Sequence, residues 1–212
     1  MKDYIFVHIP RTGGRSIEKA LGLRNDHGYY LPNEVELIHK NIKTHIIELT
    51  EPVVRNKFKF TVVRNPWDQS VAYWRNFHGE IPRAGHNFES WIQWIAKEYP
   101  NRKNEEFDWD FKMPLDQLDY CRNENGEILI DYFLKFETLK TDFIPIANRF
   151  NLPTELPTIG MEEKQMIIKS SLVQGGDLVI TENYRDMYKS QESIDAVASL
   201  NKELIERFNY TF

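Results

Sequence analysis

The chain opens with an apolar run, a glycine turn and then a helical pattern. Residues Tyr4 to Ile9 form a short apolar run with β-branched members, which predicts one buried strand. Pro10 to Gly14 holds two adjacent glycines, which predict a tight turn. From Ser16 onward, apolar residues recur at three- and four-residue spacing, and this spacing predicts a helix. The segment is therefore predicted to run from a strand through a glycine-rich loop into a helix.

A second strand-to-helix junction is predicted further along the chain. Phe58 to Val63 is β-branched and aromatic, which indicates a strand. Asn65 is suited to cap a helix, and Pro66 is suited to its first position. An apolar stripe continues the predicted helix at Val71, Trp74 and Phe77. Arg64 would then lie at the corner between strand and helix.

The remaining periodicity predicts further strands and helices in alternation. Strands are expected over 43–49, with His45 near the start, and over 128–136 after an Asn-Gly turn. Helices are expected from Thr50, and over 88–99, 138–150 and 193–208. Met161 to Thr181 gives no clear pattern. The alternation predicts an α/β fold with a parallel central sheet flanked by helices, as a single domain over 1–212.

Composition excludes several classes of protein. The chain has 212 residues, of which 41% are hydrophobic, and a net charge of −5, so a general nucleic-acid binder is not expected. Cys121 is the only cysteine, which fits a reducing compartment. Neither a secretory signal nor an apolar run of membrane-spanning length is present. We expect a cytoplasmic protein without a membrane partner.

The first junction has the chemistry of an anion site. Free N–H groups and the positive end of a helix dipole favour phosphate or sulfate, and cations and hydroxyls accompany them in the sequence. The nucleoside triphosphatase loop G-x-x-x-x-G-K-[ST] is absent. The groups expected around the anion are those of Arg11, Thr12, Gly13, Gly14, Arg15 and Ser16.

Both junctions resemble elements of the sulfotransferase family. His8 to Ser16 resembles the family's 5'-phosphosulfate loop, P-K-T-G-G-T-S, and Val62 to Asp68 resembles its 3'-phosphate element. Asp131 to Leu139 and Tyr184 to Tyr210 are similar to later landmarks of relatives of heparan sulfate 2-O-sulfotransferase. The resemblance implies a P-loop fold like that of nucleotide kinases. It also implies 3'-phosphoadenosine-5'-phosphosulfate as donor and 3'-phosphoadenosine-5'-phosphate as product, with no metal and with Arg64 at the 3'-phosphate.

Two positions depart from the family pattern. Arg11 replaces the loop lysine, and because a guanidinium is a poor proton donor it would stabilise the leaving phosphate by charge alone. The serine that usually shares the 3'-phosphate is replaced by Ala72. Ser70 is two residues earlier, but on a helix it would face about 200° away.

The base that removes the acceptor's proton is expected to be His45, by analogy with relatives that carry a histidine at a comparable place. A core histidine and a carboxylate base remain the alternatives. The candidate carboxylates are Glu34, Glu36 and Glu48, whereas His8 is expected to be structural and His39 and His78 to lie on the surface.

Other residues are candidates for contacts with the donor. Trp67 could stack on the adenine, but core packing is the stronger expectation, as it is for the Trp91 and Trp94 pair. Lys169 to Ser171 is a candidate donor loop, with an exposed charged turn as the simpler interpretation.

The expected activity is sulfuryl transfer to a hydroxyl, less readily an amine, of a small-molecule or carbohydrate acceptor. A kinase-type phosphotransferase and a non-catalytic nucleotide-binding module are the alternatives. The sequence determines neither the acceptor nor the oligomeric state.

Overall fold

The computed structural model describes residues 2–24, 40–76, 86–102, 116–157 and 183–212. Its centre is a parallel three-stranded sheet in the order β1 (Tyr4–Val7), β2 (Phe58–Val63), β3 (Tyr132–Lys135). The register pairs Phe6 with Phe60 and Phe60 with Tyr132. The strands predicted at β1 and β2 are confirmed.

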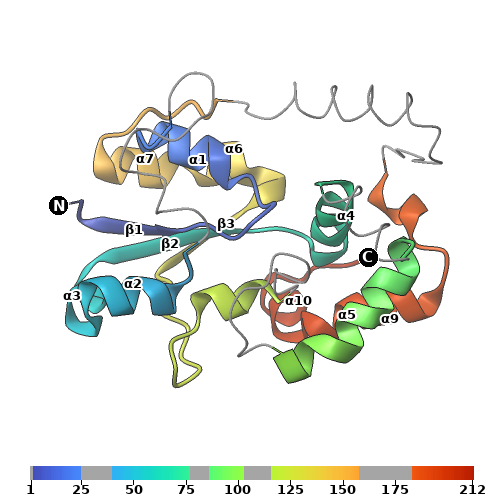
Figure 1. Cartoon of the computed structure of the whole chain (residues 1–212). Coiled ribbons are helices and arrows are strands. Elements are labelled where there is room, and N and C mark those ends of the chain that lie inside the picture. The colour runs from blue at the N-terminus through green and yellow to red at the C-terminus, as the bar shows by residue number, and fades with distance from the viewer. Residues whose placement is uncertain (1, 25–39, 77–85, 103–115, 158–182) are drawn as a thin grey trace.

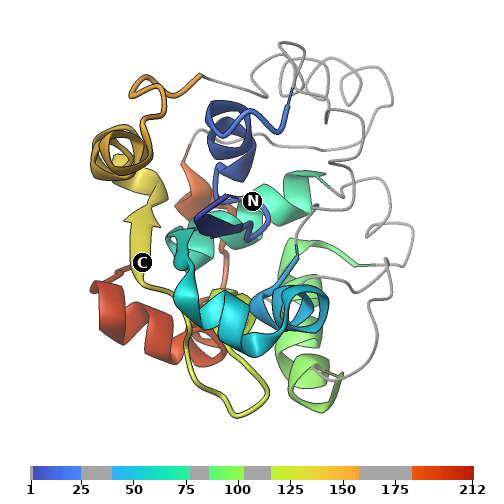
Figure 2. The same cartoon turned by 90° about the vertical axis from the view of Figure 1, so that its left-hand side faces the viewer.

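Helices cover both faces of this sheet (Figures 1 and 2). One face carries α1 (Gly14–Ala20), α6 (Leu139–Asp142) and α7 (Ile144–Phe150), and the other carries α2 (Ile42–Leu49) and α3 (Glu51–Asn56). Because strand side chains alternate between faces, Ile5 and Val7 pack toward α2 while Phe60 and Val62 pack toward α1. The predicted α/β architecture is therefore confirmed.

A further group of helices lies beyond the carboxyl ends of the strands (Figure 1). It contains α4 (Pro66–Asn76), α5 (Phe88–Arg102), α9 (Gln191–Leu200) and α10 (Lys202–Phe208). Trp67, Trp91 and Trp74 are buried together there. The expectation that Trp67 packs in the core is therefore confirmed. Short 3₁₀ helices complete the described chain: η3 (Gln117–Cys121), η4 (Phe136–Thr138) and η5 (Tyr184–Met187).

The strand predicted over 43–49 is wrong. This segment is helix α2, which begins after Asn41, whose side chain accepts a hydrogen bond from the Thr44 backbone N–H at 2.9 Å. The apolar residues Ile42, Ile46 and Leu49 recur with helical spacing and pack on the sheet, while Ile47 is 81% exposed. A short apolar run is ambiguous between strand and helix, and here the N-cap decides it.

Three other predicted elements are shorter or divided. The strand expected over 128–136 is confined to β3, and Ile128 instead forms an isolated antiparallel bridge with Arg122. The helix over 138–150 breaks at Phe143, next to a proline in the first turn of α7. The helix over 193–208 breaks at Asn201, whose side-chain N–H donates to the carbonyl of Val197.

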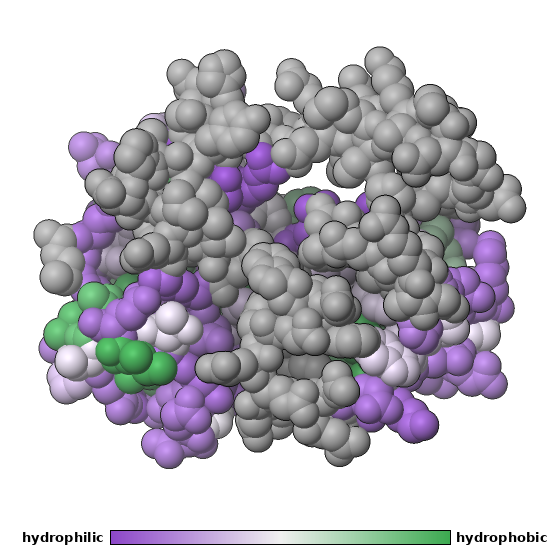
Figure 3. Space-filling model, in the orientation of Figure 1, coloured by the Kyte–Doolittle hydropathy of each residue, from purple (hydrophilic) through white to green (hydrophobic). Residues whose placement is uncertain are grey.

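The described residues on the face shown in Figure 3 are mainly hydrophilic, with apolar side chains exposed near α2 and α3. Ile47 and Val53 are the exposed large apolar residues on these two helices. Within the described ranges, no helix has the length and apolar character needed to cross a bilayer.

Candidate functional site: two coupled strand-to-helix corners

The backbone of the first strand-to-helix corner, residues 8–16, has the shape of an anion nest. Arg11 has φ 62° and Gly13 has φ 87°, both left-handed, whereas Thr12 between them is not. Alternation of left-handed and ordinary backbone turns successive N–H groups toward one concavity, which suits an anion. A Cβ on Gly13 would make a tight contact of 3.0 Å with the Phe136 ring, and the positive φ makes a side chain strained there in any case.

The carbonyl groups of this loop are held by side chains. The Thr12 hydroxyl donates to the Ile9 carbonyl at 2.7 Å, and Gln69 Nε2 donates to the Pro10 carbonyl at 2.9 Å. Arg64 Nη1 donates to the Arg11 carbonyl at 2.8 Å. These bonds hold the unusual backbone at Arg11 and give the loop carbonyl groups hydrogen-bond donors from the protein itself.

Beneath the loop lies a buried ionic network. His8 Nδ1 lies 2.6 Å from Glu18 Oε1, and Arg24 Nε donates to Glu18 Oε2 at 2.5 Å. His8 and Glu18 are both almost completely buried. The imidazole packs so closely on Gly14 that a Cβ there would lie 2.1 Å from His8 Cδ2. The expectation that His8 is a packed residue is confirmed, and it forms the floor of the loop.

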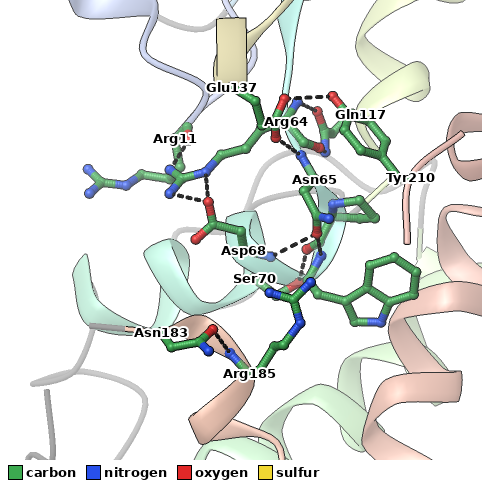
Figure 4. A network of polar contacts seen from close by, with 12 residues as sticks. Arg11, Arg64, Asn65, Asp68, Ser70, Gln117, Glu137, Asn183, Arg185 and Tyr210 are labelled. Atoms are coloured by element: carbon green, nitrogen blue, oxygen red, sulfur yellow. Dashed lines mark hydrogen bonds and ion pairs between the residues drawn. The ribbon is translucent and has the colours of Figure 1, made fainter. Parts of the chain in front are cut away.

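The second strand-to-helix corner, residues 62–68, is organised by Arg64. Its Nε and Nη2 both contact Asp68 Oδ2 at 2.7 Å, and its guanidinium lies 4.1 Å from the centre of the Phe136 ring. Together with the bond to Arg11, these contacts hold the side chain between the two corners (Figure 4). The sequence placed Arg64 at this corner, but its link to the loop required the tertiary structure.

Distant residues clamp the backbone of the second corner (Figure 4). Gln117 accepts from the Arg64 backbone N–H at 2.9 Å and donates to the Arg64 carbonyl at 2.7 Å. Glu137 accepts from the Asn65 N–H at 2.6 Å and from the Tyr210 hydroxyl at 3.1 Å. The Asn65 side chain caps α4 by accepting from the backbone N–H of Trp67, as predicted.

Neither residue considered as the second 3'-phosphate partner offers a donor toward this corner. Ala72 is buried, and the hydroxyl of Ser70 donates to the Pro66 carbonyl at 2.8 Å within α4. Intrahelical bonding of this kind is common for serine. Ser70 therefore does not replace the missing family serine.

Comparison with known proteins decides the family. The model of the sulfotransferase family matches residues 2–211, which is nearly the whole chain. The chain belongs to the sulfotransferase family. Comparison with curated proteins gave no match, and comparison with solved structures gave none either. The family assignment accords with the two corners and supports sulfuryl transfer as the general chemistry.

In this member of the family, His45 lies on α2 and not on a strand. It is 8% exposed, and among the described residues its imidazole forms no hydrogen bond or ion pair. Burial lowers the pKa of His45 to about 4, with Glu48 opposing this effect and Lys40 adding to it. The imidazole is therefore uncharged at neutral pH. No described contact joins His45 to the two corners, so its role as the base stays a prediction.

Of the alternative carboxylates, Glu48 forms an ion pair with Lys40 at 2.5 Å. Other predicted positions lie outside the described residues: Glu34, Glu36, His39, His78, Phe77 and Lys169 to Ser171. Across the described ranges, no three His, Cys, Asp or Glu side chains are grouped to hold a metal ion.

Sequence reasoning missed several residues of the two corners. The pairing of Arg64 with Asp68 has a sequence signal, since opposite charges four residues apart on a helix commonly meet. Gln69, Gln117 and Glu137 have no such signal, because their partners are distant in the chain. Their roles depend on how the sheet brings separate segments together.

Proposed function

We propose that this protein transfers a sulfuryl group from 3'-phosphoadenosine-5'-phosphosulfate to a hydroxyl group of a small-molecule or carbohydrate acceptor. The observation that carries the proposal is the 2.8 Å hydrogen bond from Arg64 to the Arg11 carbonyl. The donor carries its two anionic groups on one ribose, so the two sites that bind them must be neighbours. A direct bond between the corners meets this requirement.

The first corner suits the phosphosulfate end of the donor. The nest at Arg11 and Gly13, with the hydroxyl of Ser16 and the cation of Arg15, provides the donor set expected for an anion. Thr12, whose hydroxyl is used by the Ile9 carbonyl, contributes its backbone. Gly14 lets the loop rest on His8, and a side chain there would disturb the nest.

The donor, when bound, would supply an activated sulfur whose bond to the 5'-phosphate oxygen breaks as the bond to the acceptor oxygen forms. Arg11 would neutralise the phosphate left behind, since its guanidinium stays charged at every physiological pH. Arg64 would hold the corner at which the 3'-phosphate binds.

His45 is proposed to take the acceptor's proton. Its imidazole is uncharged at neutral pH and so is free to accept a proton, although burial, which lowers its pKa to about 4, also makes it a weaker base than an exposed histidine. The expected result of His45→Asn is intact binding of 3'-phosphoadenosine-5'-phosphate with loss of turnover on an acceptor identified by screening. Equal turnover in this variant would assign the base to another group.

The decisive experiment is calorimetric titration with 3'-phosphoadenosine-5'-phosphate without metal, in parallel with ATP and Mg²⁺. We expect binding of the bisphosphate and its loss in Arg64→Ala. Arg149→Ala is the control, because Arg149 likewise stacks on an aromatic ring, that of Phe58, at 4.1 Å, but lies on α7 and belongs to neither corner. Preference for ATP with Mg²⁺ would favour a phosphotransferase and reject the proposal.

A further inference from the structure

Arg185 is an exposed cation held in place by aromatic rings. It lies on η5, where its guanidinium carbon is 4.7 Å from the centre of the Tyr184 ring and 5.7 Å from that of Phe212. Its backbone N–H donates to the Asn183 side chain at 3.1 Å. Among the described residues it forms no ion pair with a carboxylate. Stacking restricts this side chain without using its N–H donors.

Several contacts place Arg185 at the second corner. The Tyr188 hydroxyl, just after η5, donates to the Trp67 carbonyl at 3.0 Å, and the Tyr184 ring, on which Arg185 stacks, is in edge contact with Phe212 at 6.0 Å. Phe212, the other ring under Arg185, is in edge contact with Trp67 in the first turn of α4. Figure 4 shows the Arg185 side chain rising from η5 toward Asn65.

All three nitrogen atoms of the Arg64 guanidinium already have protein partners. Its Nε and Nη2 bind Asp68, and Nη1 binds the Arg11 carbonyl. Two carboxylates, those of Asp68 and Glu137, stand at the same corner, and only Asp68 is paired with a cation among the described residues. A phosphate that enters here meets negative charge, so it requires a cation in addition to Arg64.

Other groups on α4 do not fill this need. Ala72 has no donor, and the Ser70 hydroxyl is bonded to the Pro66 carbonyl. Arg75, near the end of α4, is only partly exposed. Arg185 combines exposure, a fixed orientation and N–H donors that no carboxylate occupies.

We propose that Arg185 binds the phosphate monoester at the second corner and takes the place of the family serine that is missing at Ala72. This inference rests on the proposed function, because it assigns a contact to the 3'-phosphate of the donor. In this arrangement Arg64 positions the loop through Arg11, and Arg185 supplies the accessible guanidinium.

The test compares two nucleotides that differ only in the 3'-phosphate. Binding of 3'-phosphoadenosine-5'-phosphate and of adenosine-5'-phosphate is measured by calorimetry for the wild type, Arg185→Ala, Arg185→Lys and the control Arg149→Ala. We expect Arg185→Ala to weaken binding of the bisphosphate by about tenfold to a hundredfold, the usual effect of losing a charge-assisted hydrogen bond. The affinity for adenosine-5'-phosphate should change by less than about threefold. Arg185→Lys should retain part of the preference for the bisphosphate, because it keeps the charge.

Each outcome has one meaning. Loss of affinity confined to the bisphosphate, with Arg149→Ala unchanged, supports the assignment. Equal affinity of wild type and Arg185→Ala for the bisphosphate overturns it while leaving the proposed function standing. Equal losses for both nucleotides also overturn it, since the effect would then not depend on the 3'-phosphate. If the wild type binds neither nucleotide, the proposed function fails and this inference fails with it.

Discussion

Gly14 lies against the imidazole of His8 more closely than any side chain would allow. A Cβ added at Gly14 would be 2.1 Å from His8 Cδ2 and 2.2 Å from Nε2, whereas ordinary contacts begin at 3.4 Å. Gly14 is the first residue of α1 and does not have a positive φ, so conformation alone does not demand glycine. The ring of His8 is what excludes a side chain at this position.

The loss of stability expected from a side chain at position 14 depends on how firmly the His8 ring is held. Relief of the overlap requires a shift of about 1.3 Å, the difference between 3.4 and 2.1 Å. The ring is bonded to Glu18 at 2.6 Å and stacked on Phe6, so it has little freedom to move. Overpacking of a core costs about 1–3 kcal/mol, and more when the neighbours are rigid. We therefore expect Gly14→Ala to lower the free energy of unfolding by about 3 kcal/mol.

The assay is a double-mutant cycle with His8→Ala, followed by urea unfolding. Removal of the imidazole opens the space, so Gly14→Ala should then be neutral or stabilise by up to about 1 kcal/mol, the usual gain from alanine in a helix. The expected coupling between the two positions is about 3 kcal/mol.

Gly126→Ala is the control for this cycle. Gly126 has φ 78° and no atom within 4 Å of an added Cβ, so its replacement costs only backbone strain, about 1–2 kcal/mol. That cost should be the same with and without His8. If Gly14→Ala costs as much in the His8→Ala background as in the wild type, the imidazole does not exclude the side chain and the reasoning is refuted.

Two further predictions concern pH. Because burial lowers the pKa of His45 from 6.5 to about 4, the unfolded chain binds more protons between these values and stability falls as the pH decreases through them, by about 3 kcal/mol at most. His45→Asn should flatten this part of a stability profile measured by urea unfolding, and an unchanged slope would contradict the assignment. Burial and the neighbouring Asp119 raise the pKa of Asp116 from 3.8 to about 6, so this carboxyl has the opposite effect and costs stability as the pH rises through that interval. Asp116→Asn, which can still accept from the Leu118 N–H, should stabilise the protein at pH 8 by about 1–2 kcal/mol and have little effect below pH 3.8, whereas equal stability at pH 8 would argue against a buried charge there.

Local patterns were sufficient to predict the strands, turn and cap of the two corners, but not the distant side chains that hold them. The strand over Phe58–Val63, the cap at Asn65 and the turn at Gly13 were all predicted, because each depends on residues close together in the chain. Local patterns misplaced His45, since a short apolar run fits a strand or a helix equally well, and the cap that distinguishes them, Asn41, precedes the run.

The sequence by itself determined where the chain turns and which cations stand at the turns. Glycine conformations, capping side chains and apolar periodicity act within a few residues, so they can be followed along the chain. Only the tertiary structure decided what those cations bind. Arg64 reaches the Arg11 carbonyl because β1 and β2 are paired in parallel, and Arg185 reaches the second corner because η5 packs beside α4. Such contacts arise from the burial of apolar faces of separate elements, which no local pattern specifies.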